Sequence, residues 1–422
     1  MSMSIKQAFA CLFLLILLWA CGTSSQPVEQ TTPTTGDWLV KFDLNGHVLP
    51  VNMSLSMDHG DVDATFINGK ERILVEDVRI DGDSIEITMP LYDSEFRGTI
   101  SDDSIISGSW INFIKGSDYI VPFNAHSGQH PRFQLDADGR VGNVAGRWEV
   151  DFVHKGDTTK AVGIFEQEGS LLTGTFLTET GDYRYLEGGL VDSTFALSCF
   201  DGSHAFLFTG KQNNDSIIEG EFYSGIHWFE KWSAVRNDDF ELTHPDSLTF
   251  LKEGYDMIDF SLPDLKGNRV SPKDLKYKDK VVLVQIMGSW CPNCMDETAL
   301  LCELYDKRNE DGLEIIALAF EKHHGTPKAE ERVRRMIEHH GIQYDVLLAG
   351  DASKSNATAQ LPFLNHVMSY PTCIFIDKDG MVRKIRTGFY GPGTGEHYEE
   401  YVKQLEAFVD EMLFEDLAVR GD

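Results

Sequence analysis

The spacing of hydrophobic and polar residues divides the chain into two parts of different character. Between residues 37 and 236 the two kinds alternate in short runs, separated by turn dipeptides such as Asn45-Gly46 and Asp81-Gly82. Alternation with a period of two is typical of strands with one buried face, and such dipeptides favour tight hairpins. We therefore expect an all-β region made of antiparallel meanders.

The all-β region contains an internal repeat. Matching segments recur 110–112 residues apart, namely 36–38 (GDW) with 146–148 (GRW), and 103–106 (DSII) with 215–218 (DSII). The nearly constant offset predicts two copies of one meander, at about residues 36–125 and 146–236. We expect each copy to curl into a barrel or sandwich, which removes the open edges of its sheet.

Strands and helices alternate in the second part. Residues 281–287 form a continuous hydrophobic run, which is typical of a strand buried on both faces. The pattern predicts an α/β domain over residues 254–416, preceded by a linker over 237–253 and followed by a tail over 417–422. The further elements expected are helices at 295–308, 327–340 and about 395–414, strands at 313–320 and 344–348, and a hairpin of 374–376 with 381–386.

The first 20 residues predict a secretory signal. Lys6 precedes a hydrophobic run of 13 residues, whereas a membrane-spanning helix needs about 20. The ending Leu18-Trp19-Ala20-Cys21 resembles a bacterial lipoprotein signal, which implies lipidation of Cys21 and anchoring to the cell envelope, facing the periplasm. An ordinary cleaved signal with an incidental Cys21 is the alternative. A polar tether over residues 21–36 follows.

Charge and cysteine content narrow the possible functions. The 37 Lys and Arg residues against 67 Asp and Glu residues give a net charge of −30, which repels phosphate backbones, so nucleic-acid binding is excluded. The seven cysteines are too few for a disulfide-stapled scaffold. No metal site is expected, because Cys302 and Cys373 are isolated and no His accompanies them at zinc-ligand spacing.

Two cysteines stand where redox chemistry requires them. The sequence Cys291-Pro292-Asn293-Cys294 joins the expected strand at 281–287 to a helix, and Cys-x-x-Cys in this position indicates thiol-disulfide exchange. Unpaired N–H groups and the dipole at a helix N-terminus stabilise a thiolate there. We predict that Cys291 is the nucleophile, that Cys294 is the resolving thiol, and that their disulfide serves without another cofactor.

Residues 255–415 resemble the thioredoxin fold, and specifically the membrane-tethered TlpA/ResA-like thiol-disulfide oxidoreductases. The resemblance rests on an N-terminal hairpin at 260–268, on the active-site segment 290–294 and on the loop 370–372 with its cis-proline. It implies that Pro371 faces the cysteines. The residues that it implies for the client groove are Trp290, Pro292, Asn293, Tyr370 and Thr372.

The same resemblance suggests how a proton is handled. Thioredoxin has a buried Asp six residues before the nucleophile, where this chain has Gln285, which cannot titrate. The ResA-like branch has a Glu three residues after the second cysteine, which corresponds to Glu297 on the helical face of Cys294. Glu297 is therefore the candidate proton acceptor, with a pKa raised by partial burial. The alternative is a first-turn Glu that only complements the helix dipole.

The resemblance implies an envelope enzyme that reduces disulfides of client proteins, with electrons from a membrane donor protein. Apocytochrome c, in cytochrome c-type biogenesis, and damaged envelope proteins are the clients it suggests. One alternative is a peroxiredoxin-like peroxidase, although that chemistry requires a Thr three residues before the reactive Cys, and Gly288 precedes Cys291 at that spacing. The other is a ligand-binding lipoprotein with an auxiliary thioredoxin domain.

Overall fold

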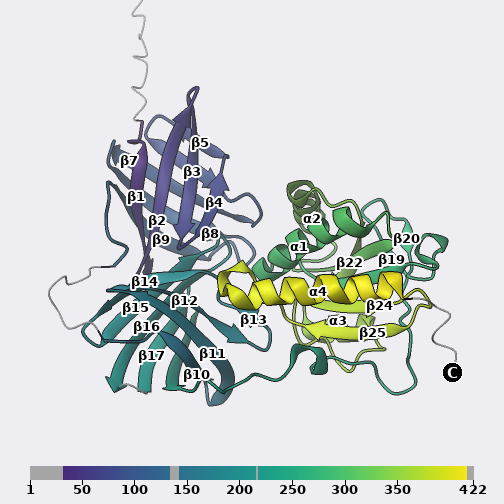
Figure 1. The fold of residues 1–422 in the computed structure, drawn as a ribbon. Coiled ribbons are helices and arrows are strands. Elements are labelled where there is room, and N and C mark those ends of the chain that lie inside the picture. Colours follow the sequence, from purple (N-terminus) through teal and green to yellow (C-terminus); the bar gives the residue numbers. More distant parts are fainter. Residues whose placement is uncertain (1–31, 134–141, 215–216, 416–422) are drawn as a thin grey trace, which may run out of the picture.

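The computed structural model describes residues 32–133, 142–214 and 217–415 (Figure 1). The predicted signal and Cys21 lie outside these residues. Two β units stand one above the other on the left of Figure 1, and an α/β domain, green to yellow, lies beside them. Within the described ranges, no helix combines the length and the apolar character that crossing a membrane requires.

The first β unit is one antiparallel sheet with the strand order β4-β3-β2-β1-β9-β8-β7-β6-β5. Hydrophobic side chains alternate along its strands, as in β3, so that one face of the sheet is buried. Its strands are β1 (Gly36–Leu44), β2 (His47–Asp58), β3 (Asp61–Asn68), β4 (Glu71–Val75), β5 (Val78–Asp81), β6 (Ser84–Thr88), β7 (Ser94–Asp102), β8 (Ile105–Asn112) and β9 (Ile120–Ser127).

The second β unit repeats this meander but closes on itself. Its order is β11-β10-β18-β17-β16-β15-β14-β12-β13, and β11 also pairs with β12, which completes the ring. Closure leaves the ring without a free edge, as expected from the sequence. Its strands are β10 (Gly146–His154), β11 (Asp157–Glu168), β12 (Leu171–Thr178), β13 (Gly181–Asp182), β14 (Leu186–Val191), β15 (Thr194–Phe200), β16 (Ala205–Asn214), β17 (Ile217–Ser224) and β18 (Trp228–Arg236).

The C-terminal domain has a central five-stranded sheet of order β23-β22-β21-β24-β25. Strands β21, β22 and β23 run parallel, whereas β24 and β25 run antiparallel to their neighbours, which is the thioredoxin-like arrangement expected from the sequence. The strands are β19 (Leu262–Pro263), β20 (Arg269–Val270), β21 (Val281–Met287), β22 (Leu313–Glu321), β23 (Asp345–Asp351), β24 (Thr372–Ile376) and β25 (Val382–Thr387). The helices are η1 (Pro245–Ser247), η2 (Leu275–Tyr277), α1 (Pro292–Arg308), α2 (Pro327–His340), α3 (Lys354–Gln360), η3 (Pro392–Thr394) and α4 (Glu396–Phe414).

Several elements differ from their expected bounds for local reasons. Helix α1 begins at Pro292 and not at residue 295, because Cys291 caps it and proline fits the first turn of a helix. Helix α3 was not expected, since its seven residues carry no hydrophobic period. The expected linker packs against the C-terminal domain, where Thr387 Oγ1 donates to Thr249 Oγ1 at 2.7 Å.

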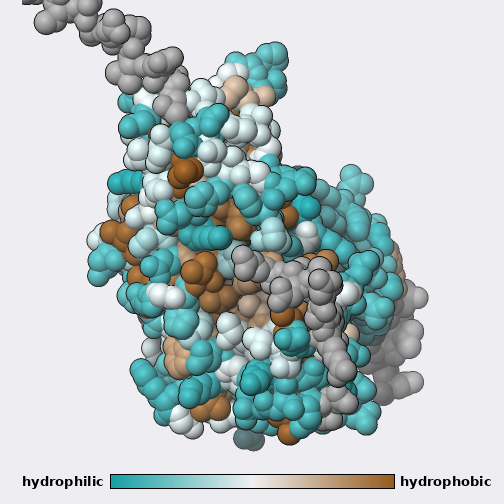
Figure 2. All heavy atoms as spheres, turned by 90° about the vertical axis from the view of Figure 1, so that its left-hand side faces the viewer, coloured by the Kyte–Doolittle hydropathy of each residue, from teal (hydrophilic) through white to brown (hydrophobic). Residues whose placement is uncertain are grey.

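The three units pack directly against one another. Phe200, at the end of β15, enters the core of the first β unit and stacks on Phe42 with ring centroids 5.1 Å apart. Tyr92 of the first β unit belongs to the core of the C-terminal domain, and Asp93 beside it pairs with Arg332 at 3.4 Å. The face of the β units that looks away from the C-terminal domain is largely hydrophilic, with hydrophobic residues in small groups (Figure 2).

Candidate active site

The two motif cysteines lie at the junction of β21 and α1. Strand β21 is buried along its whole length and delivers the chain to Cys291, which is the N-cap residue of α1. The backbone N–H of Cys294 donates to Cys291 Sγ at 3.3 Å. Cys291 is 7% exposed and Cys294 is fully buried, and both are free thiols. Thus Cys291 is the member of the pair that a substrate can reach.

The loop before β24 faces these cysteines. The Tyr370-Pro371 peptide bond is cis, and the Cys291 thiol donates to the Tyr370 carbonyl at 3.5 Å. The Trp290 ring meets Tyr370 edge-on, with centroids 5.6 Å apart. Thr372 is fully buried and its hydroxyl donates to the Ser369 carbonyl at 2.9 Å, so it fixes the loop and does not line a groove.

Glu297 lies on the inner side of α1, against β21. It is 1% exposed, and its carboxylate accepts a hydrogen bond from Gln285 Nε2 at 2.9 Å. The amide of Gln285 is fixed in turn by the Thr298 hydroxyl, which donates to Gln285 Oε1 at 3.2 Å. Gln285 therefore supplies a neutral partner to Glu297, at a place where a cation would have held the carboxylate ionised.

Burial shifts the protonation of both Glu297 and Cys294. Burial raises the pKa of Glu297 to about 7, with the Gln285 hydrogen bond opposing the shift. Burial, the hydrogen bond with Cys291, and the negative charges that Cys291 and Glu297 carry when ionised together raise the pKa of Cys294 well above its ordinary value. A neutral thiol next to a carboxyl group that titrates near pH 7 is an arrangement suited to proton transfer.

A second buried carboxylate, which the sequence did not reveal, holds the turn before Cys291. Glu321, at the end of β22, accepts hydrogen bonds from the Ser289 backbone N–H and hydroxyl, both at 2.7 Å. Arg332 of α2 lies 3.7 Å from this carboxylate and also pairs with Asp93 of the first β unit. The cysteine turn is therefore connected through α2 to the first β unit.

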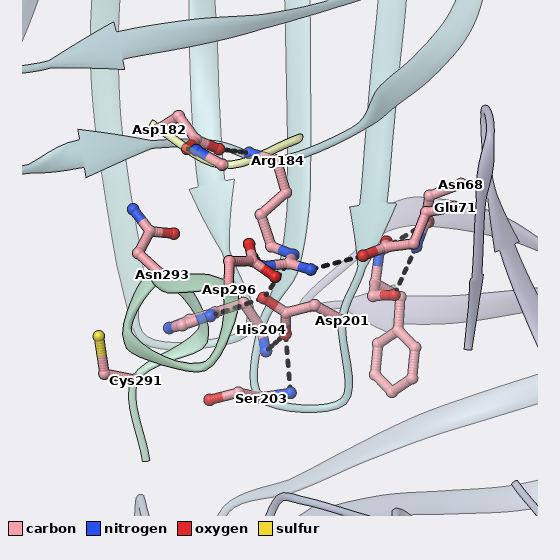
Figure 3. A network of polar contacts seen from close by, with 12 residues as sticks. Asn68, Glu71, Asp182, Arg184, Asp201, Ser203, His204, Cys291, Asn293 and Asp296 are labelled. Atoms are coloured by element: carbon pink, nitrogen blue, oxygen red, sulfur yellow. Dashed lines mark hydrogen bonds and ion pairs between the residues drawn. The ribbon is translucent and has the colours of Figure 1, made fainter. Parts of the chain in front are cut away.

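The second β unit contributes side chains to the same site. Asp182, Arg184, Asp201, His204 and Phe206 line a cavity of about 170 Å³, together with Trp290, Cys291, Pro292, Asn293 and Tyr370. Figure 3 shows Arg184 pointing between Asp296 and Glu71, with Cys291 and Asn293 beside this network. Four of the predicted groove residues thus meet at one cavity. The β-unit residues were missed, because no spacing in the sequence connects them with the cysteines.

Three further cysteines lie in the part of the chain that the structure describes. Cys199 is buried in β15, and Cys373 is buried in β24, where it pairs with Gln285 of β21. The thiol of Cys302 donates to Tyr344 Oη at 3.8 Å, on the part of α1 beyond the active site.

Comparisons with known proteins match about a third of the chain. A model described as the AhpC/TSA family matches residues 254–385. The chain is 30% identical to thiol-disulfide oxidoreductase ResA of Bacillus thuringiensis subsp. konkukian (strain 97-27) over 154 residues, which are 36% of this chain and 78% of that protein. It is also 30% identical to the thioredoxin-like protein YneN of Bacillus subtilis (strain 168), over 33% of this chain and 73% of that protein.

Among solved structures, a thiol:disulfide interchange protein of the thioredoxin family from Chlorobium tepidum TLS aligns with 37% of this chain and 94% of its own. Its TM-score is 0.29 and its identity is 18%. The match to ResA covers more than two thirds of that protein at 30% identity, and Cys291 and Cys294 lie within the residues that match the AhpC/TSA model. The chain is a member of the ResA-like thiol-disulfide oxidoreductase family and carries out thiol-disulfide exchange.

Proposed function

We propose that the chain reduces disulfides of client proteins, with Cys291 as the attacking thiolate and Cys294 as the resolving thiol. The observation that supports these roles best is the difference in exposure: Cys291 reaches a cavity, whereas Cys294 has no exposed surface. The N-cap position of Cys291 and the N–H donated by Cys294 stabilise negative charge on Cys291 Sγ.

The thiol-disulfide exchange proceeds in two steps. The Cys291 thiolate attacks one sulfur of the client disulfide, so that a Cys291–client bond forms and the other client sulfur leaves as a thiolate. Cys294 then attacks Cys291 Sγ, the client bond breaks, and the second client thiolate leaves. Two electrons pass to the client, and the chain is left with the Cys291–Cys294 disulfide.

Glu297 is the proposed acceptor of the Cys294 proton in the second step. Its pKa of about 7 allows it to be ionised before the step and protonated after it. Trp290, Pro292, Asn293 and Tyr370 form the wall on which the client lies, and Pro371 belongs to the loop whose Tyr370 carbonyl contacts the Cys291 thiol.

The cellular setting is also part of the proposal. The sequence features before residue 37 favour an extracytoplasmic protein anchored through a lipid on Cys21, and an oxidised Cys291–Cys294 pair needs an electron donor before it can act again. We place that donor in the membrane. The peroxidase alternative has less support, because the relatives are named for thiol-disulfide exchange.

A redox titration of the chain from Gly22 onward tests the proposal. The Cys291–Cys294 disulfide is followed by alkylation and mass spectrometry in dithiothreitol and glutathione buffers. A reductase requires a potential of about −250 mV or lower, whereas a value near about −120 mV would indicate an oxidant. Cys302→Ser is the matched control and leaves the titration unchanged. A chain that forms no Cys291–Cys294 disulfide contradicts the proposal.

A further inference from the structure

One hairpin of the second β unit lies across the active site. Residues 178–185, named here the covering hairpin, connect β12 to β14 and include β13. The Ser369 hydroxyl, two residues before Pro371, donates to the Thr180 carbonyl at 2.9 Å. In a second loop of the C-terminal domain, the Gly391 N–H donates to Asp182 Oδ2 at 2.6 Å. The covering hairpin is therefore hydrogen-bonded to two loops of the C-terminal domain, and its Asp182 and Arg184 line the cavity beside Cys291.

The interface between the covering hairpin and the C-terminal domain leaves no room for a side chain at three glycines. A Cβ atom on Gly181 would lie 1.9 Å from Asn293 Nδ2, and one on Gly393 would lie 2.9 Å from the Arg184 carbonyl carbon. A Cβ on Gly388 would lie 2.9 Å from the Glu179 carbonyl oxygen. These contacts exclude an extended polypeptide from the same space while the hairpin is in place.

Charge holds the hairpin at a defined position. The Arg184 side chain is 10% exposed and pairs with Asp296 of α1 at 2.5 Å and with Glu71 of β4 (Figure 3). One guanidinium thus connects the C-terminal domain with both β units. Planar, multidentate contacts of a buried Arg fix orientation more strongly than a single exposed ion pair does.

What remains beside Cys291 is the cavity of about 170 Å³. Ordinary ligand pockets measure about 300–1,000 Å³, so this space suits a molecule of a few heavy atoms. Building on the proposed function, we propose that the covering hairpin is the specificity element of this enzyme: with the hairpin closed, Cys291 exchanges only with low-molecular-weight disulfides, and a protein disulfide reaches it only after the hairpin moves.

The chemistry is the same for both substrates. The Cys291 thiolate bonds to one sulfur of the small disulfide and displaces the other as a thiolate, and Cys294 releases the first sulfur. The reduced Cys291–Cys294 pair supplies both electrons. The two substrates differ only in whether the hairpin must move before the first step.

A bulky side chain placed at the interface of the hairpin tests whether protein disulfides and small disulfides differ as substrates. Gly393→Leu places a side chain against the Arg184 backbone, and position 393 itself does not line the cavity. Lys403→Leu adds the same side chain to an exposed position of α4 as a control. Reduced chains from Gly22 onward are mixed with bis(2-hydroxyethyl) disulfide or with insulin, and the formation of the Cys291–Cys294 disulfide is timed by acid quench and alkylation.

Gly393→Leu is expected to raise the rate with insulin by about tenfold or more. The apparent rate is proportional to the fraction of molecules in which the covering hairpin has moved away from Cys291. The rate with the small disulfide stays within about twofold, as do both rates of Lys403→Leu. Hydrogen exchange at residues 178–185 verifies that the hairpin is released. Should Gly393→Leu not fold, Gly391→Val serves instead, since its Cβ would lie 2.7 Å from Asp296 Oδ2.

The proposal is overturned if hydrogen exchange at the hairpin becomes faster in the variant but the ratio of the insulin rate to the small-disulfide rate does not change. The proposed function would remain intact in that case. If neither disulfide oxidises the wild-type chain, the proposed function itself fails. The two failures are therefore distinguishable in the same experiment.

Discussion

Asp296 and Glu297 are neighbours on α1, yet they face opposite ways. Asp296 points outward, across the interface, and pairs with Arg184 of the second β unit at 2.5 Å. Glu297 points inward to β21, where its partner is the neutral amide of Gln285. The outer carboxylate therefore connects the units of the molecule, whereas the inner one is free to gain and lose a proton near pH 7.

The difference shows how one turn of helix serves two purposes. The inner face is built from residues close in sequence to Cys294, so a change there acts on proton transfer. The outer face depends on residues 112 positions earlier in the chain, so a change there acts on how the β unit covers the site. Variants on each face should therefore produce effects of different kinds.

The largest effect is expected from Arg184→Met, which breaks the outer face. Asp296, Glu71 and Asp201 would lose the cation that lies among them. Removing one partner of a buried ion pair costs about 3–5 kcal/mol, because the remaining charges stay buried. Urea denaturation measures the loss as a lower midpoint. The exposed pair Arg334–Glu330 supplies the control, since Arg334→Met should cost about 1 kcal/mol or less.

If Arg184→Met lowers the free energy of unfolding only as little as Arg334→Met does, the network contributes little to the association of the units. The outer face of α1 would then be held by the backbone contacts of the covering hairpin alone.

The inner face could be predicted from the sequence, whereas the outer face could not. Cys291, Cys294 and Glu297 lie within two turns of one helix, so their spacing alone fixes their relation. Thr372 follows the same loop as Pro371, but whether a side chain faces the groove or the core depends on the register of β24. Its interpretation as a groove residue was wrong for that reason.

The covering hairpin departs from the repeat that predicted its surroundings. In the first β unit the equivalent place is β4, a regular strand of five residues, whereas β13 has only two. Arg184, two residues after β13, has a positive φ of 58°, and its side chain pairs with Asp296 of α1. A repeat predicts that a strand recurs but gives no sign of a contact that only one copy makes.

The next effect in size concerns the stability of Glu297→Gln. The folded chain holds the Glu297 proton up to about pH 7, whereas the unfolded chain releases it near the ordinary value of 4.5. Wild-type stability therefore falls as the pH rises from about 4.5 to 7, and the loss reaches about 3 kcal/mol above that range. Because Gln carries no charge to bury, Glu297→Gln should be the more stable protein at pH 8, with the advantage shrinking toward pH 4.5.

Urea denaturation at several pH values measures this difference. Glu303→Gln, at an exposed position of the same helix, is the control and should change stability by about 0.5 kcal/mol or less at every pH. A wild-type chain as stable as Glu297→Gln at pH 8 would show that Glu297 is not held in its neutral form.

The smallest effect, expressed as a free energy, is expected on the resolving step. The mixed disulfide between Cys291 and a small thiol is formed first, and its release by Cys294 is timed from pH 5 to pH 9. In the wild type, release should accelerate through about pH 7, where Glu297 becomes able to accept a proton. In Glu297→Gln that step disappears and release at pH 8 falls by about 10²-fold, the lower range for general base catalysis. Glu303→Gln should keep the acceleration of release through about pH 7. If Glu297→Gln also keeps this acceleration, the Cys294 proton passes to solvent, and Glu297 has only a structural role.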